Sequence, residues 1–279
     1  MTDWFTEYHT PNAGFTLKIK KRLYHGKTPY QKIDVFENED YGKVLILDDL
    51  IMITEKDEYV YHEMMTHLSV FTHKNPRKAL VIGGGDGGTI RELCKHPGIE
   101  HIDQAEIDEV VIDISRRFFP KVASAYDNPK VHLHITDGYK FVEKHHHEYD
   151  LIIIDSSEPI GPGKILFGTQ FYKYVLNALH PRGIMTAQIG TPFYKPKQVK
   201  ETFRRLRRVF PIVRPFLAHV PTYADGFWCF AFCSDYYDPL RHFDAQRFES
   251  LQLKCKYYNP DVHRGAFLLP EYVARLVAG

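Results

Sequence analysis

The sequence predicts an α/β fold in which a doubly wound, largely parallel sheet follows a small antiparallel β domain. Three observations carry this prediction: short apolar runs between residues 79 and 188, helical stretches between those runs, and short β-like segments before residue 52. Buried strands that alternate with helical crossovers are typical of a parallel sheet covered by helices. We therefore expect an N-terminal β-strand domain at residues 1–56 and a Rossmann-like domain at residues 57–279.

The first part of the chain has the pattern of short strands. Apolar residues alternate or run together at 15–19, 32–36 and 44–47, between Gly, Asn and Asp breaks. Such segments predict a small antiparallel sheet. The stretch TEKDEYVYHEMMTH at 54–67 then predicts a helix, with Thr54 as its N-cap and an acidic first turn.

After residue 76 the pattern changes to apolar runs separated by helical stretches. Helices are expected at 88–95 and 109–119, and two further strands, at 212–219 and 227–233, would complete the sheet as an antiparallel pair. The expected parallel strands are residues 79–82, 101–107, 131–135, 151–154 and 184–188. Crossovers of this kind place the carboxyl ends of the strands along one edge of the sheet.

The composition disfavours several classes of partner. The 36 Lys and Arg residues nearly balance the 35 Asp and Glu residues, so neither nucleic acid nor an anionic membrane is expected. No run approaches the roughly 20 apolar residues of a membrane span, and residues 1–20 lack a signal-peptide pattern, so we expect a cytoplasmic location. The four cysteines have no zinc-like spacing and are expected to be reduced thiols.

Two clusters of like residues have simple structural interpretations. His145, His146 and His147 are expected to form a solvated turn before the strand at 151–154. The arginines at 204, 205, 207 and 208 are expected to line the solvated face of a helix. Neither cluster predicts a ligand site.

The sharpest local feature is the stretch ALVIGGGDGG at 79–88, in which a buried strand runs into a glycine loop that opens a helix. A glycine loop alone is a weak signal, because dinucleotides, sulfonium nucleosides and plain turns all use one. Glu106 ends the next strand, where a carboxylate can accept hydrogen bonds from ribose hydroxyls. Asp137 and Gly138 end the third strand, where a hydrogen-bond acceptor next to a glycine could contact an adenine amino group. Together these strand ends predict an adenosine cleft.

Asp86 narrows the choice of ligand. It lies at the helix N-terminus, where a dinucleotide would place its pyrophosphate and adenosylmethionine its carboxylate. A fixed carboxylate would repel either anion by about 1 kcal/mol at 4 Å in water, and by more at lower dielectric. A ligand with an amine tail and no carboxylate is therefore favoured. Asp86 can also cap the helix, and the two roles are compatible.

The fourth strand ends in the acidic stretch DSSEPIGP at 155–162, which places Asp155 and Glu158 at the same sheet edge. Paired carboxylates suit a polyamine. They also suit a metal, but the nearest histidines lie on the opposite side of the strand, so no metal is expected. Residues that could hold a dication, by charge or by cation–π contact, are Asp86, Asp155, Glu158, Tyr61, Tyr223 and Trp228. The Pro- and Gly-rich loop at 159–163 could close over the ligands.

Seven stretches, in order along the chain, match one family. They are YQKIDVFEN at 30–38, TEKDEYVYHEMMTH at 54–67, VIGGGDGG at 81–88, AEID at 105–108, DSSEPIGP at 155–162, PTY at 221–223 and KYYNPDVHRGAFLLP at 256–270. Together they resemble the spermidine synthases, the polyamine aminopropyltransferases, along nearly the whole chain. The resemblance implies the family's fold, a class I methyltransferase-like domain behind a small β domain.

The same resemblance implies transfer of the aminopropyl group of decarboxylated S-adenosylmethionine to putrescine, giving spermidine and methylthioadenosine. It implies no cofactor, since the donor is a co-substrate, and a homodimer or homotetramer. Asp155 would be the catalytic base. The donor would contact Gln31, Asp86, Glu106, Asp137, Gly138 and Pro162. The amines would contact Tyr61, His62, Asp86, Asp155, Ser156, Ser157, Glu158 and Tyr223.

One departure from the family bears on the acceptor. Glu158 stands where the family usually has Asp, so its carboxylate is displaced by one methylene. The alternative acceptors 1,3-diaminopropane, cadaverine, agmatine and spermidine therefore stay open. A methyltransferase is disfavoured by Asp86, and a nicotinamide dehydrogenase would need a loop that tolerates pyrophosphate. A nucleoside- or polyamine-binding protein without activity is the remaining alternative.

Overall fold

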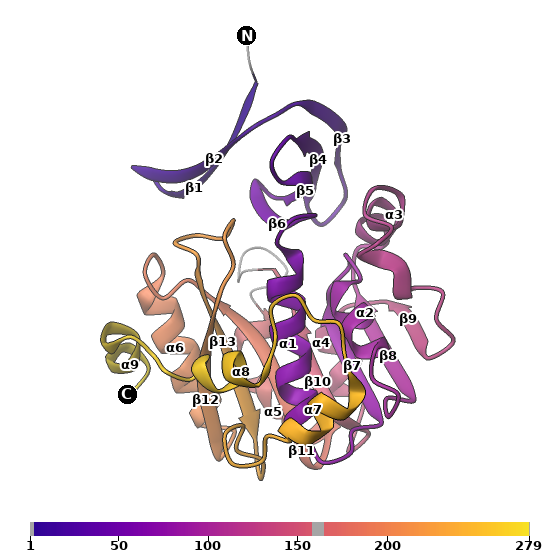
Figure 1. Ribbon diagram of the computed structural model, residues 1–279, viewed down its shortest axis with the longest axis vertical. Helices are drawn as coiled ribbons and strands as arrows, with labels where there is room; N and C mark the ends of the chain where they lie inside the picture. Colours follow the sequence, from indigo (N-terminus) through magenta and orange to yellow (C-terminus); the bar gives the residue numbers. More distant parts are fainter. Residues whose placement is uncertain (1–2, 158–164, 279) are drawn as a thin grey trace.

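A computed structural model describes residues 3–157 and 165–278 of the chain (Figure 1). Its larger part is a mixed seven-stranded sheet in the order β12-β13-β11-β10-β7-β8-β9. The strands are β7 (Lys78–Gly83), β8 (His101–Glu106), β9 (Val131–Ile135), β10 (Tyr149–Asp155), β11 (Leu179–Gly190), β12 (Ile212–His219) and β13 (Phe227–Ser234). Strands β7 to β11 pair in parallel, and β13 runs antiparallel between β11 and β12. The predicted doubly wound sheet is confirmed, including its antiparallel final pair.

The sheet reverses direction of winding at its centre. The chain runs from β7 outward to β8 and β9, then returns to place β10 on the other side of β7. Asp155 at the end of β10 pairs in register with Gly83 at the end of β7. Ligands of open α/β sheets bind at such a switch point, beyond the carboxyl ends of the strands.

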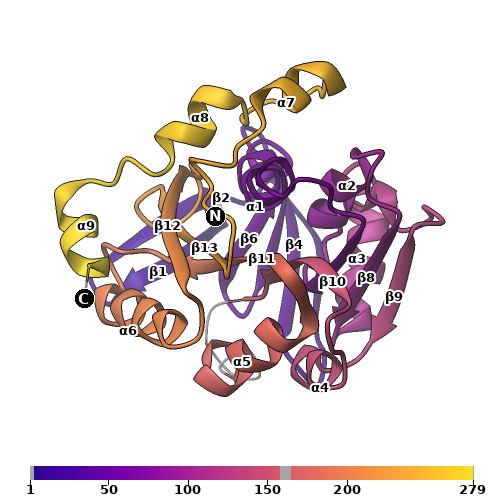
Figure 2. The ribbon, with the colours of Figure 1, turned by 90° about the horizontal axis from the view of Figure 1, so that it is seen from below.

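Helices cover both faces of the sheet (Figure 2). On one face, α1 (Glu58–Thr72) and α2 (Gly88–Cys94) pack into one apolar core cluster, which the C-terminal segment with α7 (Ala245–Leu251) and α8 (Pro260–Gly265) joins. On the other face, α4 (Gly138–Glu143), α5 (Thr169–Ala178), α6 (Pro196–Arg207) and α9 (Glu271–Val277) bury a second cluster. Within the described ranges, no helix has the length and apolar character needed to cross a membrane.

The N-terminal strands form two antiparallel sheets above the carboxyl edge of the large sheet (Figure 1). Strands β1 (Trp4–Thr10) and β2 (Ala13–Lys18) form a hairpin. A second sheet contains β3 (Lys21–Lys27), β4 (Lys32–Asn38), β5 (Gly42–Leu47) and β6 (Leu50–Thr54). Its inner face packs on α3 (Glu109–Phe118), through a shared core of Ile33, Leu45, Val111 and Phe119. The predicted antiparallel β domain is thus confirmed, whereas a boundary after residue 56 stays a prediction.

Thr54 is not the N-cap of α1. It ends β6, and its hydroxyl donates to Oδ1 of Asp57, which is the residue that precedes the helix. The other Asp57 oxygen accepts from the backbone N–H and the hydroxyl of Thr222. Asp57 therefore joins the β domain, α1 and the β12–β13 loop at one buried point. The same loop carries Tyr223 toward the edge of the sheet.

The two side-chain clusters lie where the sequence placed them. His146 and His147 are exposed in the turn before β10, Arg204 and Arg207 are exposed on α6, and Arg208 is exposed directly after it. Arg204 and Arg205 both pair with Glu201 on that helix. All four cysteines are free thiols.

Candidate active site

A cavity lies at the carboxyl edge of the sheet, between that edge and the N-terminal strands. The β domain contributes Gln31, Met52 and Glu7 to its lining, and the large sheet contributes its strand ends. The predicted residues that line it are Gln31, Tyr61, His62, Asp86, Glu106, Asp137, Gly138, Asp155, Ser156, Ser157, Tyr223 and Trp228. Glu158, Pro162 and the loop at 159–163 lie outside the described residues. The fold thus brings together the predicted donor and amine residues that it describes.

The glycine loop makes room for Asp155. Gly83 and Gly84 have φ of +83° and +68°, which side chains rarely tolerate. A Cβ on Gly83 would lie 2.3 Å from the carbonyl oxygen of Asp155, and one on Gly84 2.8 Å from Oδ2. The Gly84 N–H instead donates to that carbonyl oxygen over 2.8 Å. Two glycines in succession therefore let the ends of β7 and β10 meet.

Asp155 is buried, and each of its carboxylate oxygens accepts a hydrogen bond from one hydroxyl group. Tyr61 donates to Oδ1 over 2.7 Å, and Thr89 donates to Oδ2 over 2.6 Å. Burial and then the negative charge of Asp86 raise the pKa of Asp155, although His62, Thr89 and Tyr61 oppose the rise. A carboxylate of raised pKa is a better proton acceptor.

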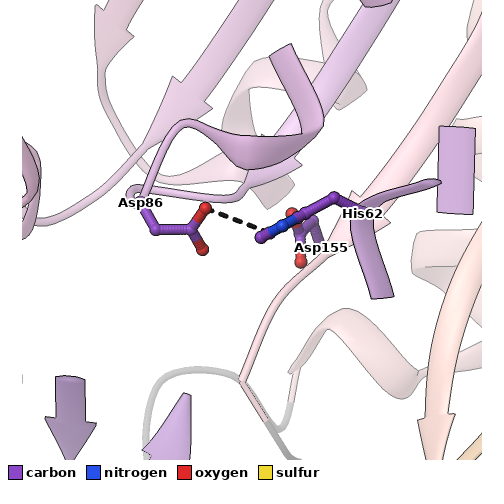
Figure 3. Close-up of side chains that lie close together, drawn as sticks. All are labelled: His62, Asp86 and Asp155. Carbon is purple, nitrogen blue, oxygen red and sulfur yellow. Dashed lines mark ion pairs between the residues drawn. The ribbon is translucent and has the colours of Figure 1, made fainter. Parts of the chain in front are cut away.

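His62 lies between two carboxylates. Its ring is fully buried, with Nδ1 2.7 Å from Oε2 of Glu58 and Nε2 3.1 Å from Oδ1 of Asp86 (Figure 3). Burial alone would lower the pKa of His62, but Asp86 and Glu58 raise it to about 10. His62 is therefore an imidazolium at neutral pH. The positive charge of His62 partly offsets the negative charge of Asp86, so Asp86 repels an anionic ligand less than its charge alone would.

Asp86 accepts a helix N–H and lines the cavity, whereas its contact with a ligand stays a prediction. Its Oδ1 accepts the backbone N–H of Gly88 over 2.7 Å, at the start of α2, and the same oxygen faces His62. Burial opposes ionisation of Asp86, but the His62 charge and the Gly88 N–H lower its pKa overall. Asp86 is thus a capping residue that is also an anion on the cavity wall.

The expectation that histidines lie away from the acidic strand end was wrong. It considered the chain near β10, whereas α1 brings His62 to the same edge. One ligand atom each of His62, Asp86 and Asp155 lies within 4.8 Å of the other two. Nε2 of His62 faces Oδ1 of Asp86 over 3.1 Å, the arrangement of a protonated ring nitrogen next to a carboxylate. We interpret the group as a charge cluster suited to ammonium ligands.

The predicted nucleoside side of the cavity is a row of strand ends. Glu106 is buried at the end of β8, and burial raises its pKa to about 7, although the N–H groups of Asp108 and Ile107 lower it. The Gln31 amide donates to Oδ2 of Asp108 over 2.9 Å. Asp137 caps α4 by accepting the N–H of Tyr139, which leaves its second oxygen for other partners.

The predicted amine side of the cavity is aromatic. Tyr61 and Tyr223 have ring centroids 5.9 Å apart, and Tyr223 and Trp228 4.7 Å. The Tyr223 hydroxyl donates to the carbonyl oxygen of Met52 over 2.6 Å, which fixes the ring against the β domain. Aromatic faces next to carboxylates suit an alkylammonium chain.

The residues that sequence reasoning missed include Gln188 and Glu7, which line the cavity, and the buried Thr89, which contacts Asp155. Thr89 follows the glycine loop directly, which is a signal that could have identified it. Gln188 lies near the end of β11, and its amide donates to the carbonyl oxygens of Ser156 and Ser157 over 2.8 and 3.2 Å. Glu7 comes from β1, which the sequence pattern did not reveal.

Comparison with known proteins gives matches along the whole chain. A family model described as "Spermine/spermidine synthase domain" matches residues 58–245, and one described as "Spermidine synthase tetramerisation domain" matches residues 3–55. A polyamine aminopropyltransferase of Alkaliphilus oremlandii is 45% identical over 276 residues, which cover 98% of this chain and 97% of the relative. One of Clostridioides difficile is 45% identical over 277 residues, which cover 98% of each chain.

Solved structures are equally similar. A spermidine synthase in complex with the transition state analogue AdoDATO has a TM-score of 0.97 and 40% identity, covering 99% of this chain and 95% of that one. The spermidine synthase of Thermotoga maritima has a TM-score of 0.96 and 39% identity, covering 99% and 94%. The likeness therefore extends over both parts of the fold.

Proposed function

We propose that putrescine is the acceptor of this chain, which belongs to the spermidine synthase family and is a polyamine aminopropyltransferase. The donor is decarboxylated S-adenosylmethionine, and the products are spermidine and methylthioadenosine. The observation that carries the proposal is the buried charge cluster of Asp86, His62 and Asp155 beside a row of strand ends. This cluster suits a ligand with ammonium groups and no carboxylate.

The reaction is a displacement at carbon. The acceptor nitrogen forms a bond to the methylene carbon next to the sulfonium, the carbon–sulfur bond breaks, and the thioether leaves as a neutral group. The acceptor ammonium must first give up a proton, and Asp155 accepts it directly or through water. Holding both substrates in line can contribute roughly 7 to 11 kcal/mol at most, so positioning is the main task of the cavity.

Different residues are assigned to the donor and to the acceptor. We assign the ribose hydroxyls to Glu106, the adenine to Asp137, Gly138, Gln31 and Pro162, and the aminopropyl ammonium to Asp86 and His62. The acceptor lies against Asp155, Ser156, Ser157 and Glu158, with the rings of Tyr61 and Tyr223 beside its chain. In this arrangement the acceptor's reactive nitrogen and the donor's methylene meet next to Asp155.

The family sets the expected acceptor and assembly state. Putrescine follows from the family, while the extra methylene of Glu158 keeps 1,3-diaminopropane, cadaverine, agmatine and spermidine as alternatives. The match of residues 3–55 to a tetramerisation domain supports a homo-oligomer, dimer or tetramer. Light scattering after gel filtration would give its mass.

A competition assay tests the acceptor. The protein is incubated with decarboxylated S-adenosylmethionine and equal concentrations of the five amines, and the products are separated by mass. We expect spermidine and methylthioadenosine to dominate. A dominant product from another amine would replace putrescine, and the absence of any aminopropyl adduct would refute the proposed reaction. A Glu158→Asp variant, run in parallel, measures how far residue 158 sets the preferred amine length.

A further inference from the structure

Thr89 contacts the proposed base directly, although it is not among the residues that the resemblance implies. It is fully buried in the first turn of α2, and its Oγ1 lies 2.6 Å from Oδ2 of Asp155. A threonine hydroxyl next to a carboxylate anion donates its hydrogen. A donor–acceptor distance of 2.6 Å is typical of charge-assisted hydrogen bonds, which are about twice as strong as neutral ones.

Each carboxylate oxygen of Asp155 accepts a hydrogen bond from a different hydroxyl group. Tyr61 approaches Oδ1 from α1, and Thr89 approaches Oδ2 from α2, so the contacts hold the carboxylate from two different helices. With one donor on each oxygen, rotation of the carboxylate about its Cβ–Cγ bond would break at least one hydrogen bond. The remaining lone pairs therefore keep a fixed direction in the cavity.

Resting on the proposed function, we infer that Thr89 is a positioning residue that orients Asp155 and sets the pH range in which Asp155 accepts a proton. Its hydroxyl stabilises the carboxylate anion and does little for the protonated acid. It therefore counteracts the two influences that favour the acid, which are burial and the negative charge of Asp86. Without the hydroxyl, the pKa of Asp155 would rise further.

Other titratable groups also face Asp155, and they bear on its pH dependence. They are Tyr61 and His62 of α1, Asp86 of the glycine loop, Glu106 of β8 and Tyr223 of the β12–β13 loop. Thr89 has no charge in either state, so its removal changes the titration of Asp155 without adding or deleting a charge. This makes Thr89 a cleaner probe than any of those groups.

The test compares Thr89→Val, which keeps the shape and removes the hydroxyl, with Thr89→Ser, which keeps the hydroxyl. Hydrogen bonds to charged groups contribute roughly 1.5 to 3 kcal/mol. In Thr89→Val, the acid limb of the pH profile of kcat should therefore move to higher pH by about one unit or more. Plateau kcat should fall roughly tenfold through lost orientation, with little change in the KM of the amine. Thr89→Ser should keep the wild-type limb.

Thr66→Val is a matched control, because Thr66 is a fully buried threonine of α1 whose hydroxyl has no hydrogen bond among the described residues. It should leave the limb in place. An unshifted limb in Thr89→Val, or an equal shift in Thr89→Ser, would overturn the inference. Should Thr89→Val fail to fold, Thr89→Ala against Thr89→Ser makes the same comparison.

A readout without turnover separates this inference from the proposed reaction. The carboxyl C=O band of Asp155, assigned by its loss in Asp155→Asn, is titrated by infrared spectroscopy in the unliganded protein. The midpoint should rise by about one pH unit or more in Thr89→Val. If the wild type forms no aminopropyl product but this midpoint shifts, the proposed reaction fails and the role of Thr89 stands. If product forms and the midpoint does not move, the role of Thr89 fails alone.

Discussion

Nδ1 of His62 lies 2.7 Å from Oε2 of Glu58, one turn earlier on α1, and this contact helps to set the charge of the cavity. Glu58 is held in turn by two N–H groups of Arg91, each 2.9 Å from a different carboxylate oxygen. His62 thereby stays charged, and with Asp155 ionised the trio of His62, Asp86 and Asp155 carries one net negative charge. A chain of buried ion pairs thus connects the α1–α2 interface to the site.

Glu58 should contribute stability that depends on pH. Burial alone would raise its pKa, but His62 and Arg91 lower it from 4.5 to about 2. A folded-state pKa below the unfolded value gives stability that is present above about pH 4.5 and is lost as the pH falls toward 2. The full contribution is on the order of 3 kcal/mol.

Glu58→Gln should therefore be less stable than wild type at neutral pH and converge with it near pH 2. Urea unfolding at several pH values measures the difference. Glu271→Gln is the control, because Glu271 forms an exposed pair with Arg275 on α9. A constant gap between wild type and Glu58→Gln across this range would contradict the prediction.

Gly88 should be irreplaceable for a steric reason. A Cβ at this position would lie 2.2 to 2.5 Å from three atoms of the His62 ring, which is itself fully buried. Gly88→Ala should displace His62, cost roughly 1 to 3 kcal/mol of stability and reduce turnover. Gly265→Ala is the matched helical control, since its Cβ would meet nothing within 4 Å. Equal melting temperatures for Gly88→Ala and wild type would show that the ring can move freely.

Asp86 should discriminate against a carboxylated donor. Removing its charge removes the repulsion between this wall of the cavity and a carboxylate on the donor. In Asp86→Ala, the preference for decarboxylated over carboxylated S-adenosylmethionine should fall by about tenfold, measured by calorimetry with both ligands. Asp113→Ala removes an exposed carboxylate of α3 and should change nothing. An unchanged preference in Asp86→Ala would refute the repulsion argument.

Glu106 should make nucleoside binding pH-dependent. Its pKa is raised to about 7 chiefly by burial, and ribose hydroxyls donate to the ionised form. Affinity for methylthioadenosine should be full above pH 7 and fall by up to about tenfold per unit below it. Glu106→Gln should bind more weakly and show a flat profile between pH 5 and pH 8. A flat profile in the wild type would place the ribose elsewhere.

The sequence located much of the cavity because parallel strands end at one edge. Asp155, Glu106 and Asp137 each follow an apolar run, so their meeting follows from the strand order alone. The glycine loop could also be recognised in the sequence, because the positive φ values at Gly83, Gly84 and Gly87 favour glycine at these positions. Their roles with substrate stay predictions.

What the sequence could not show are contacts that depend on how helices pack. The approach of His62 to Asp86 depends on how α1 packs against the start of α2, and that of Thr89 to Asp155 depends on how α2 packs against the end of β10. Strand β3 was missed because its sequence, KRLYHGK, lacks apolar alternation, and its edge position needs none. Thr54 resembled an N-cap by residue type, but the turn to Asp57 delays the helix.

Asp155→Asn tests the central claim most directly, because it keeps the shape of the residue and removes its capacity to accept a proton. Asp150→Asn is the control, because Asp150 lies at the other end of β10 and accepts the backbone N–H groups of Arg77 and Lys78. We predict that Asp155→Asn lowers kcat by at least about 100-fold while methylthioadenosine still binds with wild-type affinity. Near-normal turnover of Asp155→Asn would contradict the account.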